Sequence, residues 1–273
     1  MRRMRIATAS PHSSIAPCVS ERRSLWYHQM SRRPLIIAHR GASAVAPEST
    51  RAAIREAVRA GADMVELDVQ LTQDRRLVVF HDDRVERTTN GKGRLASLRY
   101  AQLARLDAGS WFHPRFAGES VRLVSQVVPL LPTRMGLNLE LKRTTRHTIL
   151  LRRLLRVIRR ARIGSRLLLS SFDPSLLQPL AKTRVARALI SREYPDQALG
   201  RAIRLGCLAW HPADALVTPR RIARAHAAGL RVHVWTVDDP VRARRLIRWG
   251  VDGLFTNDPA RLIKALRSRA ARA

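Results

Sequence analysis

The sequence predicts an α/β fold, a (β/α)8 TIM barrel with a small inserted segment after the second barrel strand. Three observations predict it: short apolar runs alternate with helical patterns from Pro34 onward, glycines recur between the later helices and strands, and the parallel strand candidates number eight. Alternation of this kind favours a parallel sheet with helices outside, and eight such strands close into a barrel. The length of 273 residues fits one undivided barrel.

The first elements set the pattern for the rest. An apolar run from Leu35 to Ala38 ends at His39, and a helix is expected from Ser49 to Arg59, with Ser49 as its N-cap and Gly61 as its stop. An open doubly wound sheet is the structural alternative, but the closing strand at its end favours the barrel. The predicted parallel strands are 35–39, 64–69, 136–141, 167–171, 186–190, 207–210, 231–235 and 252–255.

A ninth run, residues 77–81, is too close to the second strand to be parallel to it, so it must return antiparallel. A hairpin that turns near Asp74 and Arg75 places His81 opposite Asp68. Side chains alternate across a strand, so Glu66 and Asp68 share one face. The stretch from about 70 to 120 is then an insertion.

The charge of the chain is unusual. The formal net charge is +30, and 47 of the 51 basic residues are arginines because there are only four lysines. Such an excess favours anionic partners. The arginines are dispersed along the sequence, which favours a solvated surface over a dedicated binding stripe. We expect weak association with anionic membrane surfaces and no specific nucleic-acid partner, and the composition leaves the oligomeric state open.

Residues 1–33 differ from the rest. They are rich in arginine, serine and proline and have no apolar stretch like that of a secretory signal. We expect a disordered extension, with a transit peptide or a true start at Met30 as alternatives, and a barrel over 34–273. Cys18 and Cys207 imply no disulfide framework. There is no apolar run of 18 residues, so a cytoplasmic location is expected.

Charged side chains cluster where the predicted strands end, which is the reactive face of a barrel. Three acids on neighbouring strands suit a hard cation such as Mg²⁺ or Ca²⁺. Two basic residues add positive charge for an anionic substrate, and two histidines can act as acid and base. In chain order these residues are His39, Arg40, Glu66, Asp68, His81, Glu140 and Lys142. Each alone is better explained as a structural or surface group, but their shared position favours a site.

These motifs, taken in order, resemble the glycerophosphodiester phosphodiesterases from Pro34 to about Ile263. The resemblance rests on His39-Arg40-Gly41, Pro47-Glu48-Ser49-Thr50, Glu66-Leu67-Asp68-Val69, His81-Asp82, Thr88 to Gly93, Glu140-Leu141-Lys142, Ser171-Phe172, Val234-Trp235-Thr236 and Gly250-Val251-Asp252-Gly253. It implies a metal-dependent enzyme that hydrolyses glycerophosphodiesters to glycerol 3-phosphate and an alcohol.

The resemblance also implies the role of each residue. Glu66, Asp68 and Glu140 are expected to bind the divalent cation, Mg²⁺ or Ca²⁺, with Glu48 near it. The remaining roles that it implies are His39 and His81 as the acid/base pair and Arg40 and Lys142 as phosphate contacts. Apart from the resemblance, we expect the aromatic residues Phe172, Trp235 and Trp111-Phe112 to line the substrate pocket, with a place in the core as the alternative. The family usually has asparagine where this chain has Ser49, so we expect a modest change in the support of the site.

Two other functions remain open at this point. The same chemistry could act on lysophospholipids or other membrane-derived diesters, and the positive charge would then concentrate the enzyme at bilayers. A non-catalytic basic barrel that binds nucleic acid or phosphoinositide surfaces is less favoured, because a binding protein has no need of two histidines facing three carboxylates.

Overall fold

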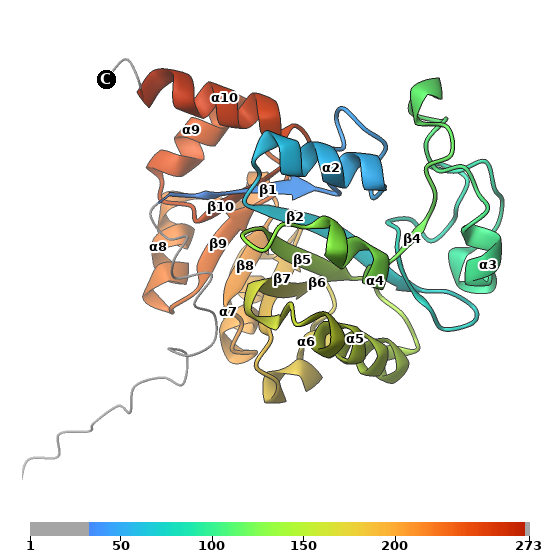
Figure 1. Ribbon diagram of the computed structural model, residues 1–273. Helices are drawn as coiled ribbons and strands as arrows, with labels where there is room; N and C mark the ends of the chain where they lie inside the picture. Colours follow the sequence, from blue (N-terminus) through green and yellow to red (C-terminus); the bar gives the residue numbers. More distant parts are fainter. Residues whose placement is uncertain (1–32, 271–273) are drawn as a thin grey trace, which may run out of the picture.

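The computed structural model describes residues 33–270, and in it eight parallel strands form a closed barrel (Figure 1). The first strand pairs with both the last strand and the second, which excludes the open doubly wound sheet. The predicted barrel is therefore confirmed. Its strands are β1 (Leu35–His39), β2 (Met64–Leu71), β5 (Gly136–Leu141), β6 (Leu167–Ser171), β7 (Ala186–Ser191), β8 (Ala209–Pro212), β9 (Arg231–Val234) and β10 (Gly253–Thr256).

Helices cover the outside of the barrel (Figure 1). Each longer helix turns one apolar stripe to the sheet, as Leu150, Leu154 and Ile158 do in α5. None of the helices within residues 33–270 is long and apolar enough to span a membrane. The helices are α2 (Arg51–Ala60), α3 (Tyr100–Leu103), α4 (Val124–Val127), α5 (His147–Ala161), α6 (Pro174–Leu177), α7 (Pro195–Arg204), α8 (Pro219–Ala227), α9 (Pro240–Arg248) and α10 (Pro259–Ala270).

The inward faces of the strands change character along their length. Ile37, Met64, Leu168 and Ala188 belong to one buried apolar cluster. Further along β2, the residues that alternate with Met64 onto the same face are acidic. The lower part of the barrel interior is thus a packed core, and the part near the carboxyl ends of the strands is polar.

Between β2 and β5 the chain leaves the barrel. Two short strands, β3 (Leu77–Val79) and β4 (Arg122–Leu123), extend the sheet antiparallel from β2. The residues between them, including α3, lie beside the barrel (Figure 1). They carry a small core of their own, to which Phe80, Leu95 and Leu103 belong.

The hairpin register differs from the expectation by one residue. Val69 pairs with Val79, and the Phe80 amide donates to the Asp68 carbonyl at 3.0 Å, so Asp68 lies opposite Phe80 and not His81. The turn is centred on Asp74 because the Thr72 and Arg76 backbones pair around it. The strand also ends at Val79, before the 81 that the apolar run suggested.

Smaller corrections affect the other element boundaries. Strand β8 runs from Ala209 to Pro212, two residues later than expected, because Gly206 is followed by two further loop residues. The expected interpretations of residues 1–33 fall outside the described residues, except for Arg33, as does Cys18.

Helix α2 is capped by Thr50 and not by Ser49. The Thr50 hydroxyl accepts from the Ala53 amide at 3.3 Å and donates to the Pro47 carbonyl at 2.6 Å. Ser49 is one residue too early: its φ of 62° is left-handed, and its buried hydroxyl has no hydrogen-bond partner. Gly61 ends the helix in a left-handed conformation, as expected.

We predict that Thr50→Ala lowers the free energy of unfolding by about 1 kcal/mol, the usual loss for a removed N-cap. Ser49→Ala is the matched control and should change stability by much less, because its hydroxyl makes no hydrogen bond. Urea unfolding of both variants measures the difference. Equal losses, or a larger loss in Ser49→Ala, would contradict Thr50 as the cap.

Candidate active site

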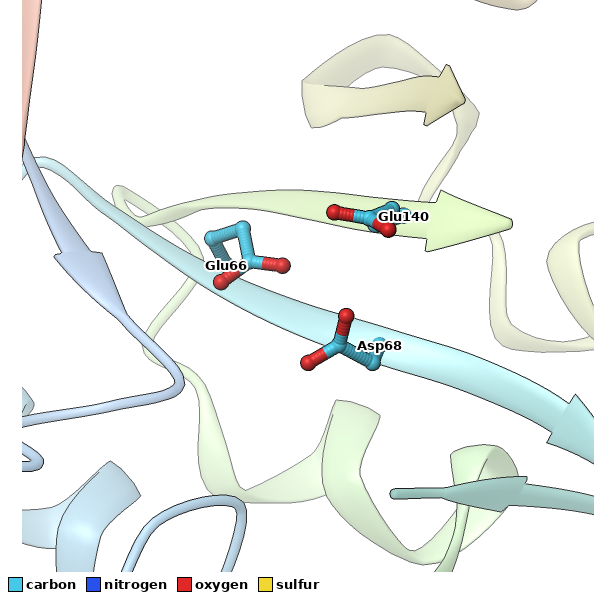
Figure 2. A group of neighbouring side chains, drawn as sticks. All are labelled: Glu66, Asp68 and Glu140. Atoms are coloured by element: carbon cyan, nitrogen blue, oxygen red, sulfur yellow. The ribbon is translucent and has the colours of Figure 1, made fainter. Parts of the chain in front are cut away.

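Three carboxylates meet near the carboxyl ends of two adjacent strands (Figure 2). Glu66 and Asp68 project from one face of β2, and Glu140 projects from β5 directly beside Asp68, because the parallel register pairs these two positions. One oxygen from each residue lies within 4.8 Å of those of the other two. Alternation along β2 and the register with β5 thus bring together the three acids that the sequence singled out.

Burial makes this arrangement electrostatically costly. Glu66 and Asp68 are only 3% and 1% exposed. Burial, together with the charge of Asp68, raises the pKa of Glu66 well above its ordinary value and that of Glu140 to about 7. Without added positive charge, the acids therefore resist full ionisation.

Two basic side chains supply part of that charge. Lys142 Nζ lies 3.0 Å from Glu140 Oε1 and 3.4 Å from Asp68 Oδ1, while Arg40 Nε lies 3.4 Å from Asp68 Oδ2. The Arg40 amide also donates to Glu66 Oε2 at 3.0 Å. Both residues predicted as phosphate contacts therefore lie against the acids at the mouth of the barrel.

The residues present fit a divalent cation. All three ligands are carboxylate oxygens, the type that Mg²⁺ and Ca²⁺ prefer, and Asp68 Oδ2 is buried without a hydrogen-bond partner. When all three carboxylates are ionised, as ligands of a cation are, they and the two basic groups leave one net negative charge at the centre of the site. The arrangement is thus compatible with a divalent cation.

His39 ends strand β1 and is held by residues from the other end of the chain. Its Nδ1 lies 2.8 Å from Asn257 Oδ1, and the Asn257 amide nitrogen donates to Asp238 at 2.6 Å. Asp238 thus turns the Asn257 oxygen toward His39, so Nδ1 carries the proton and Nε2 is left as an acceptor. Burial and the neighbouring Arg40 charge lower the pKa of His39 and keep it neutral near pH 7.

His81 reaches the site from the loop after β3. Gln70, on β2, donates to the backbone carbonyls of residues 80, 81 and 82 at 2.8 to 3.1 Å and fixes this loop against the barrel. His81 Nδ1 lies 2.5 Å from Asp82 Oδ1, a carboxylate that favours the protonated ring. Burial outweighs this attraction and lowers the pKa of His81.

A continuous chain of ion pairs joins this loop to the barrel. Arg87 donates to Asp82 and, through two nitrogens at 2.8 Å, to Glu48, which in turn accepts from Arg40 at 2.9 Å. Burial alone would raise the pKa of Asp82, but hydrogen bonds from Arg87 and His81 lower it to about 2. Glu48 therefore lies beside the site as expected, bridging two arginines.

One cavity of about 70 Å³ joins these groups. His39, His81, Glu66 and Glu140 all line it, so the two histidines face a common volume. Phe172 and Trp235 also line it, edge to face with ring centres 5.6 Å apart. Trp111 and Phe112, also expected here, do not line this cavity and lie in the insertion, but every other residue predicted for the site lines the cavity or contacts a residue that does.

Three further residues of the site escaped sequence reasoning. Arg192, directly after β7, lines the cavity with its guanidinium 5.5 Å from the Trp235 ring centre. Asn257 directly follows the last strand, and Asp238 supports it. A signal existed for two of them: Arg192 and Asn257 each come directly after a barrel strand, the position that had singled out Arg40.

The fold and the site together define a barrel enzyme of the phosphodiesterase class. The model of the glycerophosphoryl diester phosphodiesterase family matches residues 39–261, and the chain belongs to this family. This confirms the family and the enzyme class that the sequence motifs indicated.

Individual relatives agree. A glycerophosphodiester phosphodiesterase of Caldanaerobacter subterraneus subsp. tengcongensis is 34% identical over 86% of this chain and 98% of its own length, and one of Bacillus altitudinis is 33% identical over 84% and 96%. Among solved structures, an Oleispira antarctica phosphodiesterase in complex with the product sn-glycerol 3-phosphate has a TM-score of 0.82 at 30% identity, covering 88% of this chain and 99% of that one.

The raised pKa of Glu140 makes a prediction for the protein in EDTA. The folded state keeps a proton on Glu140 that the unfolded chain loses, so this residue reduces stability as the pH rises from about 4.5 to about 7. Glu140→Gln removes the effect. We compare the melting temperature of Glu140→Gln with that of the wild type at two pH values. The variant's advantage should be larger at pH 8 than at pH 4.5, by at least about 2 °C.

The difference in melting temperature between the two proteins is used because four histidines with lowered pKa values change stability in the opposite direction in both proteins. These are the buried His211 and His233 and the partly buried His39 and His81. Glu193→Gln, at an exposed position, is the control and should show no such trend. Mg²⁺ should raise the melting temperature of the wild type more than that of Glu140→Gln. A difference that does not change with pH would argue against a strained carboxylate.

Proposed function

We propose that this protein hydrolyses glycerophosphodiesters to sn-glycerol 3-phosphate and an alcohol, with a bound divalent cation and two histidines. One observation carries the proposal: His39 and His81 line the same cavity as Glu66 and Glu140. The product bound in the Oleispira relative supports the choice of substrate.

Charge supports a phosphodiester as the substrate. When bound, a divalent cation offsets phosphate charge and lowers the pKa of an attacking hydroxyl. Held by Glu66, Asp68 and Glu140, it would turn the net negative charge of the site into a single positive charge, which matches the one negative charge of a diester. Arg40 and Lys142 lie beside these acids and are proposed to contact the phosphate oxygens.

The partners of the two histidines support separate roles for them. His39 is proposed as the base, because Asn257 leaves its Nε2 free to take the proton of the attacking hydroxyl. His81 is proposed as the acid, because the Asp82 carboxylate beside its Nδ1 offsets part of the effect of burial, whereas His39 has only the neutral Asn257 amide beside its Nδ1. As the new oxygen–phosphorus bond forms, the bond to the alcohol breaks and His81 gives its proton to the departing oxygen. The attacking hydroxyl comes from water or from the glycerol itself, in which case water opens a cyclic phosphate.

The head group is proposed to leave past the aromatic pair. Phe172 is 42% exposed and stands against Trp235, with Arg192 over both rings at 5.8 and 5.5 Å. This rim offers apolar surface and the guanidinium of Arg192, which forms no ion pair with a carboxylate within residues 33–270. It suits an alcohol of moderate size attached to an anionic phosphate.

We predict that His39→Ala and His81→Ala each lower kcat for glycerophosphocholine by about 10²–10⁴-fold, the usual contribution of an acid or base. A diester whose leaving group is 4-nitrophenol separates the two roles, because this group departs without a proton. His81→Ala should recover most of its activity on it, and His39→Ala should not.

His113→Ala, at an exposed histidine in the insertion, is the matched control and should keep wild-type activity. Circular dichroism and melting temperature check the fold of each variant. Recovery of His39→Ala in place of His81→Ala would reverse the two roles, and wild-type turnover in either variant would remove that histidine from the mechanism.

Chelation tests the cation. Exhaustive treatment with EDTA should abolish turnover of glycerophosphocholine, and Mg²⁺ or Ca²⁺ should restore it. Asp68→Asn should weaken the restoration by raising the cation concentration needed, because it removes a charged ligand. Full activity of the chelated enzyme would contradict a cation held by the three acids.

A further inference from the structure

A second and larger cavity lies on the outside of the barrel, along helix α5. It has a volume of about 680 Å³, against about 70 Å³ for the active-site cavity, and the two share no lining residue. It extends between α5 and the segment formed by α4 and the short 3-10 helix Val128–Leu130 that follows it. Its apolar lining includes Leu77, Leu123, Val128, Pro129, Leu131 and Val157.

Arginines surround this apolar groove. Arg153, Arg156 and Arg160 come from α5, and Arg76 and Arg166 come from the segments on either side. In the part of the chain that the structure describes, no ion pair joins any of the five to a carboxylate. The groove therefore offers five guanidinium groups to an external anion.

The sequence around the groove explains why the arginines lack acidic partners. From Ser120 to Phe172 there are twelve arginines and lysines, and the only acidic residue is Glu140, which points into the barrel. Helix α5 itself carries apolar and basic residues and no acid. The apolar stripe of α5 is packed against the sheet, so the face that the helix turns outward is basic, and such a face attracts anionic surfaces.

Arg166 shows that one of these charges is partly removed from water. Its Nη1 donates to the carbonyls of Pro132 and Met135 at 2.9 and 2.5 Å, which are neutral partners. Burial lowers the pKa of this guanidinium. A partly desolvated cation with neutral partners has room to gain from an anion.

We propose that this groove docks the protein on an anionic bilayer and accepts one phospholipid, with the arginines on its phosphate and the apolar lining on its acyl chain. Arginine binds phosphate through two parallel hydrogen bonds, and its stem can cover apolar surface while the head stays polar. An anionic amphiphile matches both the apolar and the basic part of the lining, and the negative charge of a bilayer surface matches a groove whose lining includes no acidic residue. The proposal does not depend on the reaction at the active site.

Co-sedimentation with vesicles tests it. Phosphatidylcholine vesicles are compared with vesicles that also contain phosphatidylglycerol, for the wild type, Arg156→Gln/Arg160→Gln and Arg245→Gln/Arg248→Gln. Both double variants lose two exposed helical charges, but the second pair lies on α9, away from the groove. A basic residue at the surface contributes about 1 kcal/mol, so we expect at least a tenfold loss for the groove pair and less than a twofold loss for the α9 pair.

A charge-neutral variant tests the groove itself. Ser125 is exposed and lines the cavity, and Ser125→Trp should fill part of it without changing the net charge. We expect weaker binding to anionic vesicles, unchanged melting temperature and unchanged turnover of a soluble diester. Equal losses in the two arginine pairs, or wild-type binding by Ser125→Trp, would show general adsorption of a +30 protein and overturn the proposal.

An acidic peptide provides the remaining comparison. If a polyglutamate peptide binds the wild type and loses affinity in Arg156→Gln/Arg160→Gln, while vesicles with phosphatidylglycerol do not bind, the groove is a protein-docking site and the lipid proposal fails.

Discussion

Three carboxylates confined within 4.8 Å of one another inside the barrel set the conditions for the rest of the site. Repulsion between buried like charges is strong. Charged residues around the acids offset it, beginning with the basic side chains nearest to them. Lys142 and Arg40 touch the acids, Glu48 and Arg87 continue the alternation of charge, and Asp82 ends it at His81. The same chain of ion pairs that balances the acids thereby positions a proposed catalytic group.

Much of this could be predicted from the sequence because it follows from strand periodicity. Alternation placed Glu66 with Asp68, and the shared position at strand ends selected Glu140, His39 and Arg40. Barrel topology was recoverable because eight runs and their helices repeat in order. These are local patterns, joined by the general rule that eight parallel strands with helices outside close into a barrel. The structure confirms the barrel.

The features that could not be predicted are those for which two different structures fit the same sequence pattern equally well. A hairpin centred on Asp74 and one centred a half-residue later have the same apolar run, so the register opposite Asp68 was wrong by one. Both Ser49 and Thr50 can cap a helix, and only the left-handed backbone at Ser49 decides between them. The dispersed arginines gave no sign of the groove along α5, because folding gathers residues from separate segments and the absence of acids matters as much as the arginines.

The pairing of the first strand, β1, with the last strand, β10, affects how the site is assembled. His39 leaves the first strand, yet the side chain that orients its ring comes from just beyond the last, Asn257, which is itself held by Asp238. His39 and Asn257 are 218 positions apart in the sequence. The His39 ring is therefore oriented only when the last strand has paired with the first. Closure of the barrel is thus a condition for a correctly oriented His39. When only the first 140 residues have been synthesised, all three carboxylates of the cluster are present, but Asn257, which aligns His39, is still missing.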